Sequence, residues 1–448
     1  MKKLLIIITS IFLFVSCDVN DSDDPDPSTF TVTIENVSTA KPFVSSGVFN
    51  TPKGDAGPGP VTPGKEYEFT VKAGKGSSLS FVTMLAATND LFYAPDGSGI
   101  PLYNEDGSPF SGDVTDQIYL WDAGTEVNEE PGVGPNTVGN QTGPDTGEEE
   151  NSTVELIENI SSDSFDYPDV SEVINVTVEH IDGAEFRISI LNVSSDMALQ
   201  TSEGNRAAPI SPGVWVVHRG ENPLFTEGEA DYGQGVEAIA EDGNPTMLGT
   251  YTSDNSGITF PLSPGAWAVH ADGEMPIYVE GMPDFGEGLE AIAEDGSASM
   301  LGESLMAKAI VESSGVMNMT VGSSEPGPVL PGSMYEVSFD AVPGDRLTFA
   351  TMLAATNDLF YGPSDEGIAL FDESENPVSG DVSSQVYLWD AGTEVNEEPA
   401  IGPNTVTNQT GPDTGTEENG NVRRISDVND GFTYPSTQSI IRVTITAN

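Results

Sequence analysis

Cysteine and basic residues are scarce in this sequence. Cys17 is the only cysteine, so no disulfide bond can form within the chain, and stability must come from the core or from bound metal. Lysine and arginine number 15 against 72 aspartate and glutamate residues, which gives a net charge of −57. A surface with this much negative charge repels nucleic acids and anionic lipids. We therefore expect no nucleic-acid partner.

Histidine and the common catalytic motifs are also scarce. The chain has 3 histidines, which disfavours zinc and copper sites because those metals prefer histidine or cysteine ligands. It contains no G-x-S-x-G, no H-E-x-x-H and no phosphate-binding loop. We therefore expect a protein that is not an enzyme. A hydrolase that uses paired carboxylates stays open as an alternative.

Long apolar runs are missing after the first 16 residues. Lys2 and Lys3 precede an apolar segment that is too short to span a bilayer and has the size of a signal-peptide core. The Ser16-Cys17 step resembles a bacterial lipobox, so we predict a lipoprotein signal peptide at 1–17 with lipidation at Cys17. Residues 18–29 are predicted to be a disordered acidic tether. We expect an exported protein, lipid-anchored at the outer membrane or cell surface and touching the membrane through its lipid alone.

Most of the chain is a duplication. Residues 83–93 (TMLAATNDLFY) recur at 351–361, and residues 119–131 (YLWDAGTEVNEEP) recur at 387–399 at the same offset. FTVTIENVS at the start of the first copy returns as FRISILNVS, and VINVTVEHI at its end returns as SIIRVTITA. These matches predict one domain at 30–181 and a second at 186–447.

The second copy is longer because it contains a tandem insertion at about 205–310. SPGVWVVH and SPGAWAVH match within it, as do GVEAIAEDG (235–243) and GLEAIAEDG (288–296). The EAIAEDG pieces are predicted to form one helical turn each. The first copy (30–181) contains no EAIAEDG motif, so we expect this copy to be a reduced version of the domain.

The local pattern predicts an all-β fold. Phe30, Val32 and Ile34 alternate with polar residues, and similar short runs recur between turns rich in glycine, proline and aspartate. No long stretch has the 3.6-residue period of a helix. We therefore predict an antiparallel β-sandwich in two copies.

The motif TMLAATND, followed at a fixed distance by YLWDAGTE, resembles the bacterial branch of the spondin N-terminal domain family. The resemblance covers nearly the whole chain after the tether. It implies a C2-like β-sandwich with calcium bound by loop carboxylates, and a role in matrix adhesion. The chain departs from the animal domains at Thr88-Asn89-Asp90, at Glu126 and Glu394 where aspartate is usual, and in lacking their cysteines. A specific receptor is therefore not implied.

The acidic residues of the duplicated motifs are the candidate metal ligands. Gly124 permits a sharp turn that brings Asp122 and Glu126 together, and Asp90, from another strand end, can complete the cage. Calcium takes about six to eight oxygen ligands and tolerates such an irregular supply. Solvated loop carboxylates without a metal are the alternative. The predicted calcium ligands are Asp90, Asp122, Glu126, Asp358, Asp390 and Glu394.

Together these features predict a calcium-binding surface lipoprotein that acts as an adhesion, matrix-binding or polymer-binding module. The expected partners are calcium and an extracellular polysaccharide or matrix protein. Besides the hydrolase, a structural surface-coat protein is an alternative.

Overall fold

The structure is a computed structural model that describes residues 26–160, 164–221 and 224–448. The predicted signal segment, Cys17 and residues 18–25 of the predicted tether lie outside this range. In the described part of the chain, no helix combines the length and the apolar character needed to cross a membrane.

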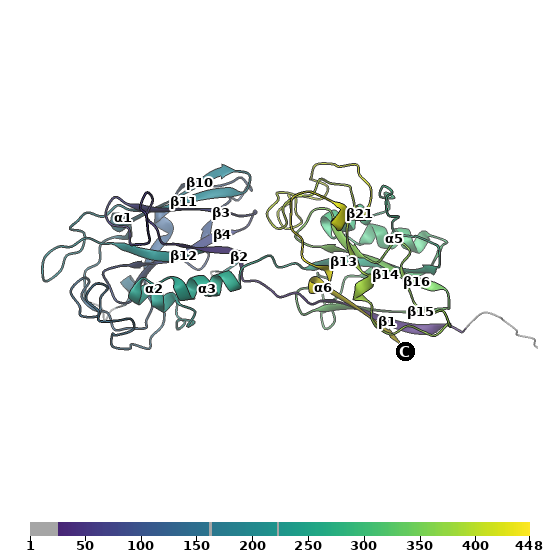
Figure 1. Ribbon diagram of the computed structural model, residues 1–448, viewed down its shortest axis with the longest axis horizontal. Helices are drawn as coiled ribbons and strands as arrows, with labels where there is room; N and C mark the ends of the chain where they lie inside the picture. Colours follow the sequence, from purple (N-terminus) through teal and green to yellow (C-terminus); the bar gives the residue numbers. More distant parts are fainter. Residues whose placement is uncertain (1–25, 161–163, 222–223) are drawn as a thin grey trace, which may run out of the picture.

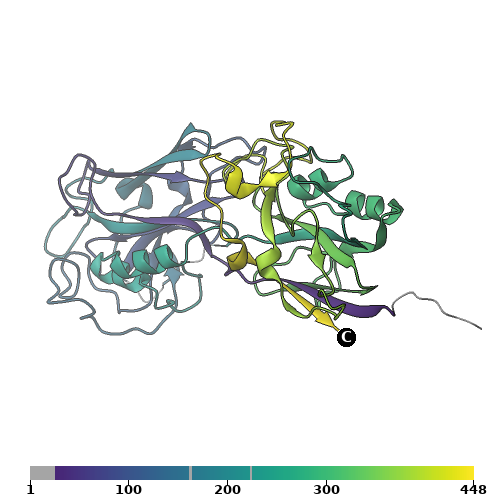
Figure 2. The ribbon, with the colours of Figure 1, turned by 45° about the vertical axis from the view of Figure 1, so that its right-hand side comes forward.

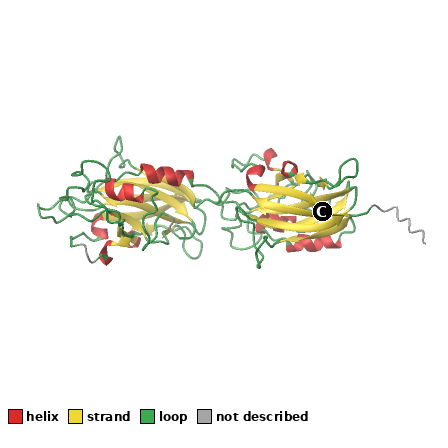
Figure 3. Cartoon of the chain, turned by 90° about the horizontal axis from the view of Figure 1, so that it is seen from below, coloured by secondary structure: helices red, strands yellow, loops and turns green. Residues whose placement is uncertain are grey.

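The described residues form two β-rich bodies that lie side by side in Figures 1 and 3. We call them the first lobe (residues 43–256) and the second lobe (residues 28–36 and 258–447). Each lobe holds one large and one small sheet, and every pairing between their strands is antiparallel. The predicted antiparallel all-β sandwich is confirmed.

The first lobe contains eleven of the named strands. Its large sheet has the order β2 (Phe43–Phe49), β12 (Ile210–His218), β4 (Ser78–Leu85), β5 (Leu91–Pro95), β8 (Ile118–Asp122) and β9 (Glu155–Leu156), with β6 (Ile100–Pro101) beside β4. Its small sheet has the order β3 (Glu66–Lys72), β11 (Glu185–Asn192), β10 (Ile174–Asp182) and β7 (Gly112–Asp113).

The second lobe repeats this arrangement. Its large sheet has the order β14 (Val311–Met317), β13 (Leu262–Ala271), β16 (Asp345–Leu353), β17 (Leu359–Gly362), β20 (Tyr387–Asp390) and β21 (Arg423–Arg424), with β18 (Ile368–Ala369) beside β16. Its small sheet has the order β15 (Met334–Ala341), β1 (Ser28–Asn36), β22 (Ile441–Ala447) and β19 (Gly380–Asp381).

Burial follows the layers of each lobe. In β1 of the small sheet, Phe30, Val32 and Ile34 are buried while the residues between them are partly exposed, as expected when one face meets the core. Strand β4 of the large sheet is instead buried at every position after the first. Its two faces contribute to different apolar clusters, one with the small sheet and one with the helices.

In the part of the chain that the structure describes, four helices cover the outer faces of the large sheets. They are α2 (Val236–Asp242) and α3 (Thr246–Asp254) in the first lobe, and α4 (Leu289–Asp295) and α5 (Ser299–Ala307) in the second. The short helices α1 (Val170–Val173) and α6 (Thr437–Ile440) each lead into a strand. The EAIAEDG pieces form α2 and α4, which are helices as predicted but longer than one turn. Both end at a glycine in the left-handed conformation, Gly243 and Gly296.

The lobes do not follow the predicted boundaries at 30–181 and 186–447. Strand β1 pairs with β15 and β22, so it lies in the second lobe, and Figure 2 shows it beside the C-terminal strand. Strand β11 has a sequence similar to that of β1, but it pairs with β3 and β10 in the first lobe. A connection of two residues between β10 and β11 explains the difference. Because this turn is so short, β11 must fold back on β10 as a hairpin. The position beside β22 is then free for β1.

The tandem insertion is divided in the same way. Strand β12 with α2 and α3 completes the first lobe, and β13 with α4 and α5 completes the second. The first lobe therefore has the helical element that we expected it to lack, because the element comes from a later part of the chain.

Candidate metal centre

The predicted ligands lie at one end of the large sheet in each lobe. Asp90 immediately precedes β5, and Asp122 is the last residue of β8. The two strands are antiparallel neighbours in which Leu91 pairs with Asp122, so the two carboxylates lie at the same sheet end. Asp358 and Asp390 occupy the matching places beside β17 and at the end of β20. All four are fully buried.

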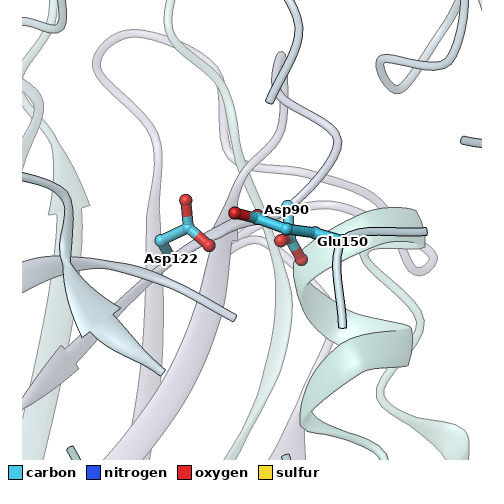
Figure 4. Close-up of side chains that lie close together, drawn as sticks. All are labelled: Asp90, Asp122 and Glu150. Carbon is cyan, nitrogen blue, oxygen red and sulfur yellow. The ribbon is translucent and has the colours of Figure 1, made fainter. Parts of the chain in front are cut away.

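The buried aspartates belong to a group that we call the strand-end cluster. In the first lobe it consists of Asp90, Asp122 and Glu150, whose ligand atoms lie within 4.8 Å of one another (Figure 4). In the second lobe the same spacing unites Asp358, Asp390 and Glu418. Glu150 and Glu418 were not predicted as ligands, although both stand in a duplicated Glu-Glu-Asn segment (149–151 and 417–419).

The predicted Glu126 and Glu394 do not join this group. Glu126 lies with Asp145 and Glu241 in a second group, which we call the helix-side cluster. Its counterpart in the second lobe contains Glu290, Glu294 and Asp413. In the first lobe the three predicted ligands are thus divided between two neighbouring clusters, and in the second lobe Glu394 belongs to neither cluster.

A pocket of about 390 Å³ opens at the helix-side cluster of the second lobe. Residues from α4, from the DAGTE turn and from the later acidic loop line it: Glu290, Glu294, Thr393, Glu394, Asp413 and Glu417. The predicted Glu394 therefore faces the same space as the helical glutamates. Their signal in the sequence was the repeated GLEAIAEDG motif, which places Glu290 and Glu294 one helical turn apart.

Glycines shape the turn that carries these carboxylates. Gly124 has φ +70°, and a Cβ on it would lie 2.6 Å from the carbonyl oxygen of Thr153. Its N–H donates a hydrogen bond to Asp122 Oδ1 at 2.7 Å, which orients that carboxylate. The predicted sharp turn at Gly124 is confirmed.

A threonine hydroxyl links the two clusters in each lobe. Thr125 Oγ1 lies 2.7 Å from Asp90 Oδ1 and 2.7 Å from Glu241 Oε1. Thr393 Oγ1 lies 2.7 Å from Asp358 Oδ1 and 2.6 Å from Glu294 Oε1. A hydroxyl has one hydrogen, so it can donate to only one of its two carboxylate neighbours. The other carboxylate needs a proton or a cation to make the arrangement favourable.

Burial and mutual repulsion disfavour the charged form of these acids. Burial raises the pKa of Asp90 well above its usual range, and the neighbouring Asp122 raises it further. Burial likewise raises the pKa of Asp358 well above its usual range, and the neighbouring Asp390 raises it further. Burial also raises the pKa of both Glu241 and Glu294 to about 8. Near neutral pH the clusters therefore favour uptake of positive charge.

Among the described residues, one buried carboxylate oxygen of the helix-side cluster in the second lobe has no hydrogen-bond partner. Glu294 is only 2% exposed, and its Oε2 atom is buried without a hydrogen bond, while its Oε1 contacts Thr393. A buried carboxylate oxygen without a partner is costly. Because Glu294 lines the pocket, a cation placed there would satisfy this oxygen.

The donors fit a hard cation. Every side chain of the two clusters is a carboxylate, with no histidine or cysteine among them. Calcium accepts such oxygen sets with irregular geometry, whereas magnesium demands a nearly octahedral one and zinc favours nitrogen or sulfur.

No model of a known protein family matches this chain, and no curated protein is similar to it in sequence. The relationship to the spondin family stays a prediction that rests on the duplicated motifs.

Proposed function

We propose that this protein is a calcium-binding surface lipoprotein whose two lobes act in adhesion to an extracellular polymer or matrix. One calcium ion in the helix-side cluster of each lobe is the core of the proposal. The observation that carries it is the buried, unpartnered Oε2 of Glu294 in a pocket lined by further carboxylates.

A cation explains the second lobe better than a proton does. A proton on Glu294 could satisfy Oε1 or Oε2, but Glu290 and Asp413, whose ligand atoms lie within 4.8 Å of each other, would still repel each other when both are ionised. A divalent ion neutralises several of these charges at once. It also leaves the threonine hydroxyl free to donate to Asp358.

Binding to a polymer is the function that such a site serves best. Asp413 and Glu417 line the pocket and are exposed to solvent, so a calcium ion there can accept ligands from outside the chain. Hydroxyl and carboxylate oxygens of a polysaccharide or matrix protein are ligands of this kind. The resemblance to spondin domains supports a role in adhesion, and the predicted lipid anchor supports a location at the cell surface.

Unfolding measurements test the calcium. We expect calcium to raise the midpoint of thermal unfolding of the full chain beyond the effect of magnesium at equal ionic strength, and a chelator to reverse it. Glu294→Gln and Glu241→Gln should each reduce that rise. Glu303→Gln and Glu227→Gln remove exposed carboxylates in the same lobes and serve as matched controls. Equal responses from all four variants would contradict the proposal.

A second experiment tests the kind of function. The full chain is applied to glycans and matrix proteins with calcium or with chelator, and both retention and turnover are measured. Calcium-dependent retention without turnover is the expected result. Turnover of a glycan that is lost in Asp122→Asn or Asp390→Asn would instead establish the hydrolase alternative.

A further inference from the structure

A pocket of about 450 Å³, which we call the junction pocket, lies where the two lobes meet. Tyr103 and Pro109 line it from the first lobe, and Ile401, Pro403 and Phe432 line it from the second. In Figure 1 the yellow loops of the second lobe reach toward the end of the β10–β11 hairpin, whose turn also lines the pocket. A cavity of this size between domains, with mostly apolar walls, is suited to a small ligand.

Polar contacts hold the second-lobe wall of the junction pocket against the first lobe. Lys72 Nζ lies 2.8 Å from Glu398 Oε2, and Arg219 Nη2 donates a hydrogen bond to Asn408 Oδ1 at 2.7 Å. The same guanidinium contacts the carbonyl oxygen of Ala400 at 3.2 Å. These second-lobe partners all belong to the loop between β20 and β21, which also supplies most of the lining from that lobe. The pocket therefore depends on this contact between the lobes.

Lys75 provides a hydrogen-bond donor in the junction pocket. Among the described residues it is the one lysine or arginine whose side chain has neither an ion pair nor a hydrogen bond. Lys75 is also partly buried. An ammonium group carries three donors, so a ligand in this pocket should offer acceptors to it.

The carboxylates that line the junction pocket already have partners. Glu397 accepts two hydrogen bonds from Asn404, and Glu398 is paired with Lys72. A cation in the pocket would therefore find neither carboxylate free, and it would be repelled by Lys75. An anion would be repelled by both carboxylates and by the net charge of −57. The charges thus favour an uncharged ligand.

The walls of the junction pocket restrict the ligand further. A pure hydrocarbon would leave the ammonium of Lys75 without an acceptor, which is costly. The rings of Tyr103 and Phe432 call for an apolar face on the ligand. Tyr103 is held in place because its hydroxyl donates a hydrogen bond to the carbonyl oxygen of Ala73 at 2.8 Å. An uncharged ring that has both hydroxyl groups and C–H faces meets all of these conditions.

We infer that the junction pocket binds one sugar unit of an uncharged polysaccharide. The hydroxyl oxygens of the sugar accept hydrogen bonds from Lys75, and its C–H faces pack on Tyr103, Phe432 and Ile401. None of the residues proposed as calcium ligands lines this pocket. The inference therefore goes beyond the proposed calcium site and does not depend on it.

Saturation-transfer NMR tests the inference at equilibrium, because a pocket for one sugar unit binds too weakly for retention on a washed surface. The full chain, in chelator, is mixed with neutral oligosaccharides (glucans, mannans and galactans) and separately with oligouronates. We expect saturation transfer to a neutral sugar and much less to the oligouronates. No transfer to any neutral sugar, or transfer to the oligouronates that is as strong, would overturn the inference.

Matched variants assign the binding to the junction pocket. Lys75→Met and Phe432→Ala should each weaken the binding about tenfold, through loss of a charged hydrogen-bond donor or of a ring contact. Lys65→Met removes a lysine elsewhere in the first lobe, and Phe165→Ala changes the matching phenylalanine of the repeated FDYP and FTYP segments. Both controls should bind as the wild type does. Equal binding by all four variants would overturn the inference.

Hydrogen exchange on the wild-type chain locates the ligand without relying on any variant to fold. A saturating neutral oligosaccharide should increase protection in residues 103–109 of the first lobe and in residues 396–403 of the second, because the junction pocket uses both. Protection that is confined to one lobe, or that lies at the helix-side clusters, would overturn the inference.

Discussion

The hydroxyl of Thr393 lies 2.6 Å from a carboxylate oxygen of Glu294, a residue 99 positions earlier in the chain. This contact ties helix α4 to the turn that follows β20, and so joins the two acidic clusters of the second lobe. Replacing Thr393 by valine removes the link. We expect Thr393→Val to lose about 1 kcal/mol of unfolding free energy, since a typical hydrogen bond contributes that much, and to bind calcium more weakly.

Thr393→Ser keeps the hydroxyl and is the matched control. Denaturant unfolding with calcium and with chelator separates the two effects. A valine variant with the calcium response of the serine variant would show that the hydroxyl does not help to form the metal site.

Gly124 tests the geometry of the turn in the first lobe. A Cβ there would lie 2.6 Å from the backbone oxygen of Thr153 at φ +70°, whereas Gly139, also at positive φ, has open space around it. Both alanine variants bear the cost of the left-handed conformation, about 1 kcal/mol, but only Gly124→Ala adds a clash. We expect Gly124→Ala to be less stable than Gly139→Ala and to lose calcium affinity. Equal stabilities in denaturant titrations would refute the proposed constraint.

The raised pKa values predict how stability changes with pH. Burial raises the pKa of Glu241 and of Glu294 from the ordinary 4.5 to about 8. Between these values the folded, metal-free protein holds protons that the unfolded chain has released. The free energy of unfolding in chelator should therefore fall as the pH rises through this window, and calcium should restore it.

Urea titrations across that pH range give the measurement. The double variant Glu241→Gln with Glu294→Gln should lose most of the slope, because its amides do not titrate there. A slope equal to that of the wild type would assign the pH dependence to other groups.

The pairing of β1 with the second lobe has a direct consequence for folding. Val32 of β1 is 1% exposed, and Ile188 of β11 is fully buried at the matching place in the first lobe. Burying an aspartate at either position should cost at least about 3 kcal/mol. Val32→Asp should loosen the second lobe, and Ile188→Asp the first.

Hydrogen exchange locates the damage. For Val32→Asp we expect protection to fall in β15 and β22 and to persist in β3 and β10, with the reverse for Ile188→Asp. Loss of protection in β10 on changing Val32 would support the division by sequence copies over the division by strand pairing.

The fold class could be predicted because its signal is local. Alternating residues such as Phe30, Val32 and Ile34 mark a strand with one buried face whatever its partners are. The partners themselves could not be read from the sequence, because β1 and β11 carry nearly the same pattern and either could complete either small sheet. The two-residue turn at Gly183 decides which strand pairs with β10, because it holds β11 next to β10 in a hairpin. Strand β1 then takes the position beside β22.

The site could be predicted in part for a similar reason. The DAGTE motif brings Asp122 and Glu126 close in sequence, and the duplicated strand ends indicated Asp90. The side chains of Asp122 and Glu126 nevertheless point to different clusters. Glu241 joins them from a helix more than a hundred residues later, by a packing contact that no spacing in the sequence specifies.

A crystal structure of the full chain grown with calcium tests the central claim most directly. We predict a density peak in the helix-side cluster of the second lobe, with Glu290, Glu294 and Asp413 as ligands at about 2.3–2.6 Å. Glu294 Oε2 should be among the atoms bound to it. An empty pocket at saturating calcium, with that oxygen still without a partner, would contradict the account.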